Sequence, residues 1–139
     1  MEVSHMSKLS MIEGIGEVYE MKLKEVGVNS VEELLEVCSS KTGRSDMAEK
    51  TGITEKLILK WANHADLFRV KGIGGEYAEL LEASGVDTIP ELKQRNAENL
   101  FTKMVEVNEE KKLVRNLPTQ DQVEDWVKQA GDLPRILEY

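Results

Sequence analysis

The stretch IEGIG at residues 12–16 returns 58 residues later as VKGIG at residues 70–74. The likeness extends beyond the pentapeptide, because nine of the 24 positions in 12–35 are identical to their partners in 70–93. A fixed internal period indicates a repeated supersecondary unit that buries part of its apolar face against a neighbouring element. The chain is therefore predicted to be a duplication.

The second copy is longer than the first. Trp61 is matched by Trp126, 65 residues later, whereas the glycine stretches are 58 residues apart, so the second copy contains seven more residues. We place this insertion between Asn96 and Pro118.

The residues after each Gly-Ile-Gly stretch have the spacing of an amphipathic helix. Apolar positions recur three and four residues apart, which puts them on one helix face. Gly27 and Gly85 follow these segments and are suited to end a helix, since glycine adopts the left-handed conformation without steric cost. No segment alternates polar and apolar residues over a strand's length. The predicted fold class is all-α.

Further helices are predicted from apolar spacing and from capping residues. Hydroxyl residues followed by Glu or Gln at the third position, at Ser30, Thr88 and Thr119, match the capping box. The remaining predicted helices cover residues 44–51, 55–68, 97–107 and 109–115.

The chain has 139 residues, of which 40% are hydrophobic, and it can bury a real core. No linker rich in Pro, Gly or Ser separates the copies, so we expect one compact helical domain. Neither a membrane-length apolar run nor a signal-peptide pattern is found, which predicts a cytoplasmic protein. The expected parts are a leader or cloning remnant at 1–8, a first repeat at 9–68, a second repeat at 69–133 and a tail at 134–139.

The net charge is −8, from 26 acidic and 18 basic residues, and both halves of the chain are acidic. Long-range electrostatics therefore act against binding a polyanion, although a local basic patch can still do so.

A Gly-Ile-Gly turn that leads into a helix exposes backbone N–H groups at the helix start. Together with the helix dipole, these groups form a site for an anion such as a backbone phosphate. The stretch at 70–74, with Ala78 four residues after Gly74, resembles the hairpin of tandem helix-hairpin-helix proteins, which include DNA-contacting domains. From Met11 to Leu133 the chain more closely resembles a bacterial and archaeal helix-hairpin-helix family of unassigned function. The resemblance implies tandem helix-hairpin-helix units and contact with a nucleic-acid backbone.

The two glycine turns depart from the DNA-binding pattern to different degrees. Where hairpins that grip phosphate commonly place Lys or Arg, two residues after the second glycine, this chain has Val18 and Glu76. The first turn is also flanked by Glu13 and Glu17, and like charges at close range cost about 1 kcal/mol even when solvated. We expect the first turn to be architectural.

Phosphate contact is therefore predicted at the second turn and at a third glycine turn near residue 52. Glycine turns between helices are common architecture, so a purely structural role is the alternative for both. The predicted nucleic-acid-binding residues are Arg69, Lys71, Gly72, Ile73, Gly74 and Gly75 at the second turn, and Gly52, Thr54 and Lys56 at the third.

No catalytic set can be assembled from the sequence. Cys38 is the single cysteine and is expected to be a buried thiol, and neither metal-ligand spacing nor a cofactor motif is found. We expect a non-enzymatic protein without a cofactor or bound metal, which binds DNA or RNA backbone without sequence specificity. The alternative is a protein-interaction or adaptor module that has lost phosphate binding.

Overall fold

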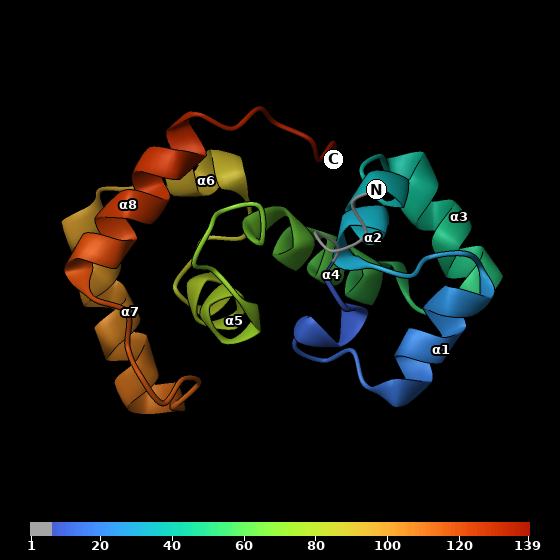
Figure 1. Cartoon of the computed structure of the whole chain (residues 1–139), viewed down its shortest axis with the longest axis horizontal. Coiled ribbons are helices and arrows are strands. Elements are labelled where there is room, and N and C mark those ends of the chain that lie inside the picture. The colour runs from blue at the N-terminus through green and yellow to red at the C-terminus, as the bar shows by residue number, and fades with distance from the viewer. Residues whose placement is uncertain (1–6) are drawn as a thin grey trace. The chain divides into compact units, whose positions relative to one another are not determined.

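The computed structural model describes residues 7–139, and this part of the chain is all-helical and contains no strand (Figure 1). The predicted fold class is therefore confirmed. A short 3-10 helix, η2 (Leu9–Met11), precedes eight α-helices. These are α1 (Glu17–Glu25), α2 (Val31–Val37), α3 (Lys41–Thr51), α4 (Glu55–Leu67), α5 (Gly75–Ala83), α6 (Ile89–Lys93), α7 (Ala97–Lys111) and α8 (Gln120–Gly131).

The chain forms two compact units whose boundary follows the repeat. The first unit runs to Asp66 and includes Ile136–Tyr139, and the second spans Leu67–Arg135. The expected boundary after residue 68 is two residues from the observed one. The prediction that residues 134–139 form a separate tail is wrong, because the last four residues belong to the first unit.

Backbone and side-chain contacts hold the last four residues on the first unit. The Glu138 N–H donates to the Ser39 carbonyl at 2.8 Å, and Arg44 Nη2 donates to the Glu138 carbonyl at 2.6 Å. Between them, Leu137 is only 2% exposed. No periodic pattern marks this segment, since its contacts are made by an isolated apolar side chain and by the backbone.

Each glycine turn is closed in the same way in the two units. Gly14 and Gly72 have φ of 96° and 103°, a left-handed conformation that favours glycine. The isoleucine that follows each of them is buried, and its N–H donates to a carbonyl three residues earlier. Gly16 and Gly74 are then extended and stand at the N-cap of α1 and α5.

A tryptophan from the last long helix of each unit packs on the turn. In the first unit, Trp61 lies in edge contact with Tyr19, with ring centroids 5.1 Å apart. In the second unit, Trp126 and Tyr77 have centroids 5.3 Å apart. Both tryptophans are 1% exposed and thus belong to the core of their units.

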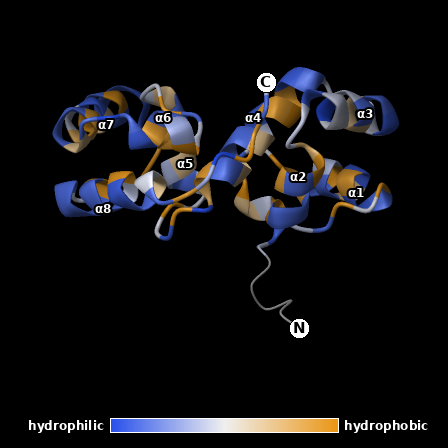
Figure 2. Cartoon of the chain, turned by 90° about the horizontal axis from the view of Figure 1, so that it is seen from above, coloured by the Kyte–Doolittle hydropathy of each residue, from blue (hydrophilic) through white to orange (hydrophobic). Residues whose placement is uncertain are grey.

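The second unit has an apolar core to which all four of its helices contribute. Helix α8 packs against α6 and α7, and α5 packs against α7 (Figure 1). Each helix shows apolar residues on part of its surface and polar residues on the rest (Figure 2). The buried core residues on these helices are Ala78, Leu80, Leu81, Ile89, Leu92, Leu100, Met104, Val123, Trp126 and Ala130.

The prediction of two helices at 97–107 and 109–115 is wrong, because α7 continues to Lys111. Asn108 lies between the two predicted helices, but its backbone is helical and its side chain pairs with the chain beyond the helix. Its Oδ1 accepts from the Val114 N–H at 2.9 Å, and its Nδ2 donates to the Val114 carbonyl at 3.2 Å. The helix instead ends at Lys112, which is left-handed. Helix α3 likewise begins at Lys41, three residues before the predicted start.

The three predicted capping boxes differ in their outcome. Thr119 and Gln122 form the complete reciprocal pair. The Ser30 hydroxyl accepts from the Glu33 N–H at 3.1 Å, but the Glu33 carboxylate reaches the Asn29 N–H instead of that of Ser30. Thr88 makes no side-chain cap.

The predicted leader lies mostly outside the described residues, which begin at Ser7. Ser7 itself is bound to the first unit, since its N–H donates to Glu32 at 2.8 Å and its carbonyl accepts from the Val31 N–H at 2.9 Å. Ser7 is therefore part of the first unit and not of the predicted leader. Within residues 7–139, none of the helices combines the length and the apolar character that crossing a membrane requires.

Gly72→Ala tests the packing of the turn. A Cβ at this position would lie 2.9 Å from Trp126 Nε1 and would also require a left-handed alanine. The control is Gly85→Ala in the same unit, which has φ of 97° and whose nearest neighbour, at 3.7 Å, is the end of the Arg95 side chain. Strained backbone alone costs about 1–2 kcal/mol, and overpacking adds about 1–3 kcal/mol.

Chemical denaturation should therefore give a larger loss of unfolding free energy for Gly72→Ala than for Gly85→Ala. Equal losses would show that the indole does not constrain the turn.

Candidate functional site

The second glycine turn opens onto a pocket of about 310 Å³. Helix α5 starts after Gly74, which provides no side-chain cap, so the first N–H groups of the helix have no partner within it. A Cβ at Gly74 would meet nothing within 4 Å, which shows that the backbone is open to approach on that side. The pocket is lined by Gly72, Gly74, Gly75, Glu76, Tyr77 and Asn116.

Side chains from α8 and from the chain before it hold this turn in place. Gln129 makes two hydrogen bonds to the backbone of Lys71, accepting from its N–H at 2.9 Å and donating to its carbonyl at 3.1 Å. The Tyr77 hydroxyl donates to the Asn116 carbonyl at 3.0 Å. The pocket is thus formed before any ligand arrives.

The charged residues of the second turn are placed unequally. Lys71 is exposed beside the turn, whereas Arg69 Nη2 donates to the Pro134 carbonyl at 2.7 Å. Arg69 is not among the residues that line the pocket, and Glu76, which is exposed, is one of them. Lys71 does not line the pocket either, but it is exposed and directly precedes Gly72, whereas the Arg69 guanidinium is engaged by the Pro134 carbonyl.

The third glycine turn uses its polar groups internally. The Gly52 N–H donates to the Ala48 carbonyl at 2.9 Å and the Ile53 N–H donates to the Thr51 hydroxyl at 3.1 Å. Thr54 accepts from the Leu57 N–H at 3.2 Å and so caps α4. Three amides at this turn, those of Gly52, Ile53 and Leu57, therefore already have partners. Lys56, the remaining predicted residue, lines a different pocket.

The first glycine turn also opens a helix without a side-chain cap, at Gly16. Its surface differs from that of the second turn, because Glu13 and Glu17 are exposed and Val18 is 66% exposed. Met21, one turn further along α1, is 59% exposed. This turn therefore presents carboxylates and apolar side chains.

Cys38 is fully buried, as expected from the sequence. Burial raises the pKa of its thiol from 9.0 to about 11, and the nearby Arg44 guanidinium offsets part of this rise. A thiol with a raised pKa is a poor nucleophile near neutral pH, since the thiolate is the reactive form. The structure thus offers no sign of a catalytic role for this cysteine.

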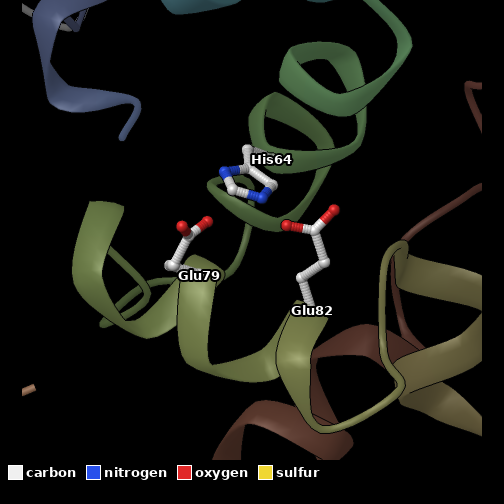
Figure 3. Close-up of side chains that lie close together, drawn as sticks. All are labelled: His64, Glu79 and Glu82. Carbon is white, nitrogen blue, oxygen red and sulfur yellow. The ribbon is translucent and has the colours of Figure 1, made fainter. Parts of the chain in front are cut away.

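Two carboxylates on α5 were not singled out from the sequence, although their spacing of three residues could have shown that they share a helix face. Figure 3 shows Glu79 and Glu82 on the same side of α5 and also labels His64, which lies on α4. His64 belongs to the first unit and the carboxylates to the second. Two carboxylates alone do not define a metal site.

The fold and the pocket define a class, that of small all-α proteins with a duplicated unit and a preformed glycine turn open at a helix start. A family model described as a domain of unknown function, DUF4332, matches residues 13–133. The chain belongs to this family. No solved structure matches the chain.

The reactivity of Cys38 gives a further test. With a pKa of about 11 in place of 9.0, the thiolate fraction at pH 8 is lower by about a hundredfold. A thiol-reactive dye should therefore modify the folded protein at least about fiftyfold more slowly than the denatured protein at that pH. Because the folded state favours the protonated thiol, its contribution to stability is complete below pH 9.0 and is lost as the pH rises to about 11. Similar rates in the two states would contradict the burial of this side chain.

Proposed function

We propose that the chain is a non-catalytic helix-hairpin-helix module that binds nucleic-acid backbone through the second glycine turn, without sequence specificity. The observation that carries this proposal is the start of α5. Its N-cap, Gly74, leaves the opening amides uncapped beside a pocket of about 310 Å³ lined largely by glycine backbone.

This geometry suits a phosphate better than other ligands. Uncapped amides at a helix start and the positive end of the helix dipole both favour an anion. Glycines allow the ligand to approach the backbone closely, and Lys71 adds one exposed cation. Contacts of this kind position a protein on nucleic acid without reading bases, which is why the proposed binding is independent of sequence.

Charge limits the affinity. The chain has a net charge of −8, and the exposed Glu76 lines the pocket itself. A phosphate in the pocket is therefore attracted by the amides and repelled by this carboxylate. We expect weak binding that is seen at low ionic strength and falls steeply with salt.

Fluorescence anisotropy with labelled duplex, forked and single-stranded DNA across a salt series tests the proposal. Lys71→Glu should abolish binding to duplex, because it reverses the exposed charge next to Gly72, while Lys93→Glu, an equal charge change at an exposed residue of α6, should reduce it far less. The absence of binding by the unmodified chain at low salt would refute the proposal.

Glu76→Lys should strengthen duplex binding, because it replaces the opposing carboxylate with a cation. The slope of log affinity against log salt should steepen by about 1 for each added phosphate contact. Val18→Lys, at the equivalent position of the first turn, adds one positive charge where Glu76→Lys adds two, so its gain in binding free energy should be less than half that of Glu76→Lys. A larger gain from Val18→Lys would assign the binding to the first turn.

A protein-interaction role is the second candidate, and exposed apolar residues of the first unit favour it. Val18 and Met21 stand three residues apart on α1 and share a face, and Met11 on η2 is 46% exposed. Apolar groups that remain in contact with water are typical of surfaces that bind another protein. If the chain binds no nucleic acid, this surface is the place to seek a partner.

A further inference from the structure

A second pocket, of about 380 Å³, lies entirely within the first unit and is separate from the glycine turn of the proposed function. Helices α3 and α4 and the end of the chain form its walls. Its volume is near the lower end of the ~300–1,000 Å³ typical of small-ligand sites. The lining residues are Lys41, Arg44, Glu55, Lys56, Leu59 and Tyr139.

The aromatic wall of this pocket is held in a fixed position although it is exposed. Tyr139 is 60% exposed, yet its hydroxyl donates to Asn63 Oδ1 at 2.9 Å. The Arg44 guanidinium lies 5.7 Å from the ring centroid. An aromatic side chain that is already ordered loses little conformational entropy when a ligand stacks on it.

The pocket is positive, unlike the chain as a whole. Three cations and one carboxylate line it, whereas the net charge of the chain is −8. Arg44 is 5% exposed, and its guanidinium donates to the backbone carbonyls of Cys38, Ser39 and Glu138, which are neutral acceptors. Lys41 and Lys56 are exposed and form no ion pair with any residue in the range 7–139.

A fixed aromatic ring beside lysines is the arrangement that binds single-stranded nucleic acid, in which a base stacks on the ring and the backbone follows the positive charge. Leu59 adds an apolar contact next to the ring. An acidic peptide would use the lysines but would gain nothing specific from a flat ring surface. The combination of ring and charge therefore favours a nucleotide over a peptide.

We propose that this pocket binds one unpaired nucleotide, with its base stacked on Tyr139 and its phosphate held by Lys41 and Lys56. The inference rests on the proposed function for its class of ligand, nucleic acid, but uses none of the residues of the second glycine turn. The two sites would then bind different parts of a nucleic acid. The turn would bind backbone phosphate of any strand, and the pocket would bind an unpaired base.

The test is titration of the full chain at low salt with the hexanucleotide (dT)6, with thymidine monophosphate and with inorganic phosphate, followed by calorimetry and by the NMR signals of the Tyr139 ring. We expect (dT)6 and the monophosphate to bind more tightly than inorganic phosphate and to shift the ring signals upfield. Equal affinity for inorganic phosphate and the monophosphate would overturn the inference, because no base would then be recognised. Tighter binding of a hexaglutamate peptide than of (dT)6 would also overturn it.

Variants separate stacking from folding. Tyr139→Leu removes the ring but keeps an apolar side chain, and it should weaken (dT)6 binding by at least about fivefold, as expected for loss of one stacked base. Tyr139→Phe keeps the ring but loses the hydrogen bond to Asn63, and it should weaken (dT)6 binding clearly less than Tyr139→Leu does. Weakening by Tyr139→Phe as large as that by Tyr139→Leu would contradict stacking.

The lysines are tested by the salt dependence. Substituting Gln for both Lys41 and Lys56 should lower the salt slope for (dT)6 by about 1.4, that is, ~0.7 for each lost contact to a single strand. Lys50→Gln on α3 is the control and should leave the slope unchanged, because Lys50 pairs with Asp46 at 3.0 Å and does not line the pocket. An unchanged slope in the double variant would contradict the phosphate contact.

Failure of this inference can be distinguished from failure of the proposed function. If duplex binding depends on Lys71 while (dT)6 binding is insensitive to Tyr139, the pocket inference fails and the function of the turn stands. If no duplex binds but (dT)6 binding requires Tyr139, the proposed function of the turn fails and the pocket inference stands.

Discussion

The packing of an indole ring against a left-handed glycine is the constraint on which each unit depends. Gly72 can accept Trp126 because it has no Cβ, and a Cβ there would lie 2.9 Å from the indole nitrogen. The same pair recurs as Gly14 and Trp61, at the looser distance of 3.6 Å. In both units the tryptophan also contacts a tyrosine in the helix that follows the turn. One contact therefore links the turn, the helix that starts at it and the last long helix of the unit.

The left-handed backbone, with φ of 96° at Gly14 and 103° at Gly72, favours glycine in both copies whatever they bind, and the indole adds a steric requirement at Gly72. A glycine turn required for packing is not by itself evidence of a phosphate site, and the first turn illustrates this, since its surroundings are acidic and apolar. What distinguishes the second turn is Lys71, an exposed cation that stands where the first turn has the exposed Glu13. In our account, the two copies share one architecture and have diverged in what their turns present to solvent.

Much of the fold could be predicted from the sequence, because helices with regular apolar spacing and glycine turns leave local patterns. The buried tryptophans, the all-α class and the Thr119 cap follow from such patterns. The docking of Ile136–Tyr139 could not be predicted, since it depends on backbone carbonyls that a distant arginine reaches. The length of α7 was not predicted, because asparagine is a poor helix former. Here the Asn108 side chain forms hydrogen bonds with the backbone of Val114, and the helix continues.

The candidate sites could likewise be predicted only where they depend on a local sequence pattern and not on tertiary contacts. The second turn could be predicted because its glycines repeat those of the first. At the third turn, the hydrogen bonds that the Thr51 and Thr54 hydroxyls accept from backbone amides are visible only in the structure. Lys56 was associated with the third turn from its position in the sequence. In three dimensions it lines a pocket with Tyr139, which is 83 positions further along the chain and enters the first unit only through tertiary contacts.

The central claim is that the opening amides of α5 meet the phosphate and those of α1 do not. Titration of the 15N-labelled chain with a short duplex at low salt, followed by amide chemical shifts, tests it directly. Our account predicts that the signals of Gly75 and Glu76 move while those of Glu17 and Val18 stay in place. Shifts at Glu17 and Val18 with none at Gly75 and Glu76 would contradict it.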